Sequence, residues 1–432
     1  MINIDIEAAL AEAEELYRAR NPKSLAQHRQ ACGAMPGGNT RSAIHVDPFP
    51  LTIARGEGAR LWDIDGHEYV DFLSEFTAGI YGHSHPAIRK AIDAALDGGL
   101  NFGAHNALEA RFAAAICARF PSIELVRFTN SGTEANLMAV SAARAITGRP
   151  KILVFAGGYH GGVFYFRGHG SPLNAPFEYL LGRYNDLAAV EALVRPHRAE
   201  LAAILVEPMQ GTTGCIPAER GFLAGLWALA DDTDALLIFD EVMTSRLAPG
   251  GLQEAHGILP DLTTLGKYVG GGMSFGAFGG RADVMERFDP RRPDAFQHAG
   301  TFNNNVLTMS AGLVGLTELY TPERARALNA FGDRLRERLN GVARQQRLAM
   351  QFTGLGSMLA VHMTDGPIRS QEDTERGNAA LRDLFYFDLL ARGIWFAMRG
   401  MFALSIALDE ADGDKLVDAV EEFAQTRAAL FA

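Results

Sequence analysis

The sequence predicts an α/β protein with a mostly parallel central sheet, helices on both faces of that sheet, and a smaller α+β domain. From about residue 85, helical stretches alternate with short apolar runs, which are typical of parallel strands buried on both faces. The 432 residues exceed what one small core requires, and the segment after residue 345 mixes strands with helices. We therefore expect one large domain and one small one.

The N-terminal segment, residues 1–75, precedes this alternation. Residues 1–20 predict a helix that ends before the sequence NPKS. Residues 50–73 contain short strand-like pieces with Gly66 in a turn. Because the central region is complete without these strands, we expect the N-terminal segment to pack with the small domain.

The large domain is predicted to cover residues 76–325 and the small domain residues 326–432. Helices are expected in the large domain at residues 86–99, 107–119, 134–147, 187–195 and 220–232. The apolar runs predicted as its strands are LVRFTN, KILVFAG, LAAILVEP, ALLIFDE and LTTLGK. Towards the C-terminus we expect helices over 305–345 and 375–391, a strand at FALSIAL and a final helix.

The composition restricts the classes of function. The formal net charge of −11 argues against nucleic acid as the main partner. The three cysteines, Cys32, Cys117 and Cys215, lie far apart and in no CxxC spacing, which indicates a reducing compartment and no metal site. The N-terminus is not a signal peptide, and no apolar run approaches the roughly 18 residues of a membrane span. We therefore expect a cytoplasmic protein that does not associate with membranes.

Polar residues follow several of the predicted strands. Ligands in open α/β sheets bind at the carboxyl ends of the strands, so these residues direct the search for chemistry. They are Thr129–Thr133, Gly157–Gly162, Glu207, Asp240 and Lys267. Three histidines near such positions, His83, His85 and His160, are expected to be loop or supporting residues, because no carboxylates gather around them in metal-ligand spacing.

The sequence FTNSGTEAN (128–136) places a strand, then Ser131, Gly132 and Thr133, then a helix that begins near Glu134. The N–H groups and dipole of a helix N-terminus bind anions. An ordinary helix cap explains the same residues, and the spacing of a P-loop is absent. The motif alone therefore fits two interpretations, an anion-binding site and an ordinary helix cap.

Asp240 ends an apolar strand, and Lys267 follows the next one. The two can face one crevice. A lysine buried there has a lowered pKa, so its neutral amine becomes a nucleophile toward carbonyl groups. Tyr159, between glycines, can stack on a flat ligand, and Thr301 in HAGTFNNN can bind an anion. Pyridoxal phosphate has the phosphate, ring, ring nitrogen and aldehyde that these residues suit.

Several motifs, in this order and spacing, resemble the class III aminotransferases of pyridoxal-phosphate fold type I. They are SGTEAN, GGYHG, LIFDEV, LGKYVGGG and GTFNNN. The resemblance covers essentially the whole chain and is strongest to the subgroup of glutamate-1-semialdehyde aminomutases and β-amino-acid aminotransferases of the β-phenylalanine type. The motifs MPGGNTRS, VEPMQG and FDEVMTSRLAPGGL point to the latter.

The resemblance implies a role for each matching residue. Lys267 would form the internal aldimine and move protons, and Asp240 would keep the pyridine nitrogen protonated. Ser131, Gly132 and Thr133 would hold the phosphate. The remaining implied contacts are Tyr159 and Val242 on the two faces of the ring, and Thr301 on the phosphate of the neighbouring subunit of a homodimer.

Two arginines are candidates for the substrate carboxylates, because guanidinium groups bind carboxylates in a bidentate fork. By resemblance, Arg41 would hold the β-amino acid and Arg399 the 2-oxo acid, with Glu75 near the substrate. On the sequence alone, Arg41 could be a surface residue and Arg399 part of a domain-interface ion pair. Met398 and Phe76 depart from the subgroup, where proline and tyrosine are common.

The expected activity is transfer of an amino group from a β-amino acid, aromatic by resemblance, to 2-oxoglutarate or pyruvate. The first alternative is an aminomutase of the glutamate-1-semialdehyde type, which moves an amine within one molecule and needs no acceptor. A decarboxylase or a racemase of the same fold is less favoured. A non-catalytic binding protein of this fold is expected to lack Lys267 or Asp240, and both are present.

Overall fold

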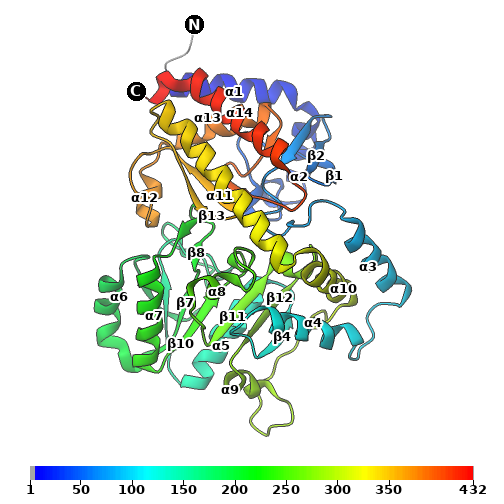
Figure 1. Cartoon of the computed structure of the whole chain (residues 1–432), viewed down its shortest axis with the longest axis vertical. Coiled ribbons are helices and arrows are strands. Elements are labelled where there is room, and N and C mark those ends of the chain that lie inside the picture. Colours follow the sequence, from blue (N-terminus) through cyan, green and yellow to red (C-terminus); the bar gives the residue numbers. More distant parts are fainter. Residues whose placement is uncertain (1–4, 432) are drawn as a thin grey trace.

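The computed structural model describes residues 5–431 and is built around a seven-stranded sheet, which occupies the lower half of Figure 1. The strand order is β4-β12-β11-β10-β7-β5-β6, and β12 alone runs antiparallel to its neighbours. The expected mostly parallel α/β sheet is therefore confirmed. The strands are β4 (Leu125–Thr129), β5 (Lys151–Phe155), β6 (Glu178–Gly182), β7 (Leu201–Val206), β10 (Leu236–Asp240), β11 (Leu262–Gly266) and β12 (Gly276–Gly280).

Both faces of this sheet are covered by helices. Ile152 and Val154 of β5 pack with the alanines of α5 (Gly132–Thr147). Leu153 and Phe155 of the same strand point the other way and pack against α7 (Arg220–Thr233). This burial on both faces explains why the strand sequences are almost wholly apolar. The other helices around the sheet are α3 (Pro86–Asp97), α4 (Ala107–Arg119), α6 (Leu187–Val194), α8 (Gly251–His256), α9 (Ala282–Met285) and α10 (Val306–Val314).

Two strands of the sheet were not predicted from the sequence. The edge strand β6 is short and half exposed, and β12 has the sequence GAFGG, which favours a loop. In β12 the glycines are required by close packing: a Cβ at Gly276 would lie 2.1 Å from the carbonyl oxygen of Ser131, and one at Gly280 would lie 2.0 Å from that of Asp261. Neighbouring backbone therefore makes glycine necessary in this strand.

The N-terminal strands join the C-terminal part of the chain. Strand β3 (Glu68–Asp71) pairs in parallel with β15 (Ile394–Trp395), which completes the four-stranded sheet β1-β2-β3-β15. The expected packing of the N-terminal strands with the tail is confirmed, whereas the division at residues 75 and 325 stays a prediction. The other strands are β1 (Ile53–Glu57), β2 (Arg60–Asp63), β8 (Met209–Gln210), β9 (Ile216–Pro217), β13 (Gln351–Leu355), β14 (Met358–His362) and β16 (Met401–Ala403).

Helices cover this second group of sheets at the top of Figure 1. The stretch 305–345 is helical as expected and contains two α-helices: α10 continues into a π-helical turn at Gly315–Leu319, and α11 begins after a break at Tyr320 and Thr321. The stretch near 375–391 likewise contains the end of one short helix and then another. The helices are α1 (Ile6–Arg20), α11 (Pro322–Gln345), α12 (Gln371–Glu375), α13 (Ala379–Ala391) and α14 (Glu410–Arg427). No helix within residues 5–431 has the length and apolarity to cross a bilayer.

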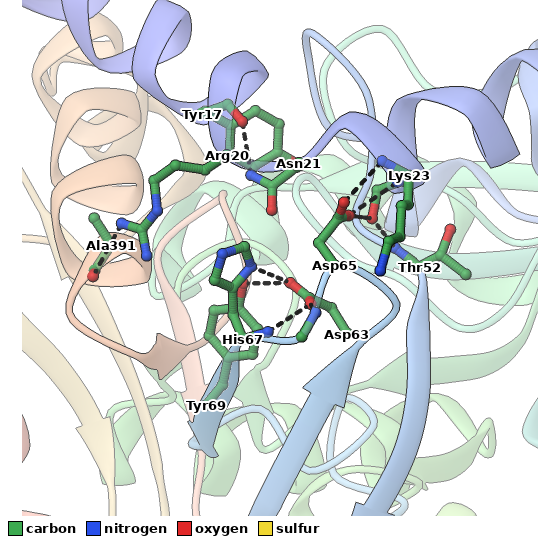
Figure 2. Close-up of polar contacts among 12 residues, drawn as sticks. Tyr17, Arg20, Asn21, Lys23, Thr52, Asp63, Asp65, His67, Tyr69 and Ala391 are labelled. Atoms are coloured by element: carbon green, nitrogen blue, oxygen red, sulfur yellow. Dashed lines mark hydrogen bonds and ion pairs between the residues drawn. The ribbon is translucent and has the colours of Figure 1, made fainter.

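The first helix, α1, ends at Arg20 as expected, and a second N-terminal helix that was not predicted, α2 (Pro22–Cys32), follows it. Its first amides are capped from a distance: the carboxylate of Asp65 accepts hydrogen bonds from the backbone N–H groups of Lys23 and Ser24 at 2.7 and 2.9 Å (Figure 2). Such a long-range cap leaves no local signal in the sequence. Residues 1–4 of the predicted first helix lie outside the described residues.

Candidate active site

A cavity of about 340 Å³ opens at the carboxyl ends of the central strands. Its lining brings together residues that are far apart in the sequence, as expected for a crevice in an open α/β sheet. The predicted site residues that line it are Arg41, Ser131, Gly132, Thr133, Tyr159, Asp240, Val242 and Lys267. Three others, Glu75, Thr301 and Arg399, do not line it.

Lys267 follows the last residue of β11 and has a positive φ of 53°, which is unusual for a residue with a side chain. Its side chain reaches the cavity, and its surroundings change its protonation. Burial lowers the pKa of Lys267, and the carboxylates of Asp240 and Glu207 oppose this effect. A larger fraction of this amine is therefore neutral than in a free lysine, which makes it a better nucleophile.

Asp240 is held at the end of β10 by three donors. Its Oδ2 accepts hydrogen bonds from the side chain of Asn136 at 2.9 Å and from Nδ1 of His160 at 2.8 Å. Its Oδ1 accepts from the amide of Val242 at 3.0 Å and lies 3.5 Å from the hydroxyl of Thr264. These bonds fix the position and orientation of the carboxylate.

A second buried carboxylate, Glu207, lies at the end of β7. It accepts hydrogen bonds from the amides of Tyr159 and Gly211 at 3.0 and 3.1 Å, so it fixes the backbone of the tyrosine that lines the cavity. Burial raises the pKa of Glu207 to about 7, and the nearby His160 opposes this shift. The sequence placed Glu207 at a strand end without a role, and the structure shows what it binds.

The Ser131–Thr133 turn serves first as a helix cap. The hydroxyl of Ser131 accepts a hydrogen bond from the amide of Glu134, and helix α5 begins at Gly132, two residues earlier than expected. The amides of Gly132 and Thr133 belong to the first helical turn, which has no intrahelical acceptors for them. The cap and an anion site are therefore compatible at this helix N-terminus.

Arg41 and Glu75 form an ion pair of 2.7 Å, in which both side chains are about half exposed. Glu75 belongs to a segment, Ser74–Thr77, in which four successive residues have positive φ values between 47° and 82°. This unusual backbone is held by Asp71, whose Oδ1 accepts hydrogen bonds from the amides of Leu73 and Ser74. Arg41 thus lines the cavity with its guanidinium already partly engaged.

Arg399 lies near the same segment, with its guanidinium 4.7 Å from the ring centre of Phe76. Its Nε is buried without a hydrogen-bond partner, and its one side-chain hydrogen bond goes to the sulfur of Met401. Burial, together with the positive charge of Arg167, lowers the pKa of Arg399 to about 10. Within residues 5–431, no carboxylate forms an ion pair with Arg399, which contradicts the alternative of a domain-interface ion pair.

Thr301 is exposed on the loop between α9 and α10, away from the cavity of its own subunit. The same loop is bound to the turn before α5, because Asn130 donates a hydrogen bond to the side chain of Asn303 at 3.0 Å. The predicted role of Thr301 therefore requires a second subunit.

Two side chains at the site were missed in the sequence. Asn136 is buried on the inward face of α5 and joins Asp240 to Thr264, whose hydroxyl donates to its Oδ1 at 2.7 Å. An asparagine among the alanines of a helix was the available signal. Arg167 follows a segment whose backbone pairs with the Tyr159 loop, and nothing in its local sequence indicates this position.

The class of protein follows from comparison with known families. The model of the family described as Aminotransferase class-III matches residues 42–408. The chain therefore belongs to the class III aminotransferases, and it is a pyridoxal-phosphate-dependent transaminase of fold type I.

Individual relatives indicate which class III aminotransferases the chain is similar to. The β-phenylalanine transaminase of Variovorax paradoxus is 54% identical over 430 residues, which are 100% of this chain and 99% of that protein. The crystal structure of a β-phenylalanine aminotransferase from that organism matches with a TM-score of 0.97 over 99% of both chains. A glutamate-1-semialdehyde 2,1-aminomutase of Sorangium cellulosum is 41% identical over 93% of this chain and 96% of its own. A solved transaminase with the cofactor bound is 33% identical, with a TM-score of 0.87 over 95% and 98% of the two chains.

The residues of the cavity fit pyridoxal phosphate. Lys267 offers an amine of lowered pKa to the aldehyde. Asp240 offers a fixed carboxylate to a protonated ring nitrogen. The first turn of α5 offers backbone amides to the phosphate. Val242 packs against Gly132, where an added Cβ would lie 2.8 Å from its methyl groups. Val242 is therefore in direct contact with the Ser131–Thr133 turn, which we call the phosphate turn because its amides fit a phosphate.

Replacing Gly276 by alanine is expected to destabilise the fold by about 2–4 kcal/mol and to weaken cofactor retention. The new Cβ would lie 2.1 Å from the carbonyl oxygen of Ser131, so the phosphate turn must move. Thermal unfolding and cofactor absorbance after dialysis measure both effects. Gly221→Ala is the matched control, because nothing lies within 4 Å of its added Cβ. Equal behaviour of the two variants would contradict the prediction.

Proposed function

We propose that this enzyme transfers the amino group of a β-amino acid with an aromatic side chain to a 2-oxo acid. The observation that carries the proposal is the pair of arginines beside the cavity: Arg41 lines it, and Arg399 is a cation without a carboxylate partner in residues 5–431. A transaminase seats two carboxylates in turn. In a β-amino acid the carboxylate is one carbon further from the amine, so a second arginine suits it.

The residues of the site act on the substrate through the bound cofactor. Pyridoxal phosphate supplies an aldehyde and an electron-withdrawing ring. Lys267 would hold that aldehyde, and its amine would take the proton from the substrate carbon that bears the amino group. Asp240 keeps the proton on the ring nitrogen, supported by Asn136 and His160. Tyr159 and Val242 would hold the ring, and Ser131, Gly132 and Thr133 would bind the phosphate.

The β-phenylalanine transaminase to which the chain is 54% identical supports the aromatic β-amino acid. The decisive experiment incubates purified enzyme with β-phenylalanine or α-phenylalanine, each with and without 2-oxoglutarate or pyruvate. Consumption of β-phenylalanine only when a 2-oxo acid is present supports the proposal. Isomerisation of glutamate-1-semialdehyde without transfer to any acceptor would instead favour the aminomutase.

Exchanging each arginine for alanine is expected to separate the two halves of the reaction. Arg41→Ala should raise KM for the β-amino acid about 10–100-fold, and Arg399→Ala should do the same for the 2-oxo acid, because each loses one charge-assisted pair. Half-reactions followed by cofactor absorbance measure the two effects separately. Arg183→Ala, at an exposed arginine, is the charge control. Equal effects of Arg41→Ala and Arg399→Ala on both substrates would contradict the assignment.

Arg167 adds a second positive charge near Arg399, which favours an acceptor with two carboxylates. Arg167→Gln is expected to raise KM for 2-oxoglutarate by about tenfold and to leave KM for pyruvate within about twofold. Steady-state kinetics at a fixed amino donor measure the ratio. Parallel changes for both acceptors would show that Arg167 does not recognise the second carboxylate.

The enzyme works as a cytoplasmic homodimer in this proposal, with Thr301 on the phosphate of the partner subunit. Two adjoining loops support the proposed dimer. Asn304 and Asn106 bind the Thr301 loop to residues 101–106, and Phe302 and Phe102 on these loops are 56% and 52% exposed. Large exposed apolar side chains on adjoining loops are typical of a subunit interface. The three free cysteines agree with a reducing compartment.

A further inference from the structure

A second cavity, of about 210 Å³, lies between α1, α13 and the β2–β3 hairpin (Figure 2). It shares no lining residue with the active-site cavity. Its walls combine apolar side chains with charged and polar ones. The apolar part is formed by Leu16, Phe387 and Leu390.

Arg20 supplies a cation to this cavity. Its Nη1 lies 3.5 Å from the carbonyl oxygen of Ala391, which is at the limit of a hydrogen bond. None of the carboxylates in residues 5–431 forms an ion pair with it. The guanidinium therefore retains donors for a carboxylate.

Asn21 supplies a hydrogen-bond acceptor that has no donor in the described structure. The residue is 4% exposed, and its Nδ2 donates to the carbonyl oxygen of Tyr17 at 2.7 Å, which fixes the orientation of the amide. Its Oδ1 is buried and has no hydrogen-bond partner. Figure 2 shows this oxygen pointing from α1 toward the side of the cavity formed by His67. A buried acceptor left unpaired is unfavourable, so a donor from a ligand would stabilise it.

The other charges of the cavity balance one another. Arg427 binds Asp388 through two contacts of 2.9 and 3.2 Å, and the charge of Glu12 also acts on Arg427. His67 is bound to Asp63 at 2.9 Å. The lining thus contains both signs of charge, which suits a ligand that is itself zwitterionic better than a simple anion.

We propose that this cavity binds a small free amino acid with an aliphatic side chain. The carboxylate pairs with Arg20, the ammonium group donates to Oδ1 of Asn21, and the side chain packs against Leu16 and Phe387. The ligand contacts α1, α13 and β3. It therefore stabilises the packing of the N-terminal helix α1 against the sheet β1-β2-β3-β15. The proposal does not depend on the identity of the amino donor.

The test is equilibrium dialysis of holoenzyme whose cofactor has been capped with aminooxyacetate, so that the active site cannot bind amino acids. The probes are L-valine, 3-methylbutanoate, which lacks the amine, and isobutylamine, which lacks the carboxylate. We expect saturable binding of one L-valine per subunit in the millimolar range and at least about tenfold weaker binding of the other two. Arg20→Ala should weaken L-valine binding about tenfold or more.

Arg18→Ala is the matched control, because Arg18 is exposed on the same helix and does not line the cavity. Asn21→Leu removes the acceptor and should also weaken binding, and Arg20→Ala, which leaves the buried amide in place, covers the case that the leucine variant does not fold. The proposal is overturned by absence of saturable binding to capped enzyme, by equal losses in Arg18→Ala and Arg20→Ala, or by binding of 3-methylbutanoate as tight as that of L-valine.

Discussion

Lys267→Ala is expected to reduce amino transfer by at least about 10⁴-fold while leaving the fold intact. In the proposed function this amine is the nucleophile and the proton carrier, and the lowered pKa of Lys267 suits both tasks. No other lysine lines the cavity, so no neighbouring amine can replace it. Single-turnover absorbance with β-phenylalanine measures the loss of the chemical step directly.

The control for this variant is Lys90→Ala, which removes a lysine on the exposed face of α3. A small primary amine added to Lys267→Ala should restore part of the activity, because it supplies the missing base in solution. Retention of more than a tenth of the wild-type rate, without added amine, would show that Lys267 is not the base.

Asp240→Asn is expected to lower kcat by about 10²–10³-fold with little change in either KM. Asparagine fills the same space but cannot balance a positive charge on the ring nitrogen. It would also place an amide group opposite Asn136 and His160, which now donate to Oδ2. Steady-state kinetics give the loss, and the absorbance of bound cofactor shows whether the ring remains in place.

The neighbouring residue provides the matched control. Glu241 is also fully buried, but it accepts hydrogen bonds from the amides of Leu252 and Gln253 at 2.9 Å and does not line the cavity. Glu241→Gln is therefore expected to cost about 1–3 kcal/mol of stability and to leave kcat within about threefold. Similar losses of kcat in both variants would mean that Asp240 affects kcat only by stabilising the folded structure.

The cofactor end of the site was the most predictable from the sequence. Asp240 and Lys267 each follow an apolar strand, and the rules of parallel sheets bring such residues to one edge. The surroundings of Arg399 were less predictable, since its contact with Phe76 joins residues more than 300 positions apart. Local patterns do not encode such contacts.

The failures of secondary-structure prediction have the same cause. Helix α2 is capped by Asp65, about forty residues away, and strand β12 needs glycines because the backbones of Ser131 and Asp261 approach it. In both places a distant part of the chain decides the local structure. The π-turn that ends the α10 segment likewise has no evident signal in the sequence.

The pairing of β3 with β15 has a consequence for biosynthesis. Val70 and Ile394 are partners in this sheet, so the N-terminal strands cannot complete it until almost the entire chain has left the ribosome. The cavity-lining turns around Ser131, Asp240 and Lys267 belong to earlier segments that can assemble first. Arg41 and Glu75, before the large sheet, must wait for Arg399, after it. During synthesis, the residues proposed to hold the cofactor can therefore come together before those proposed to recognise the substrate.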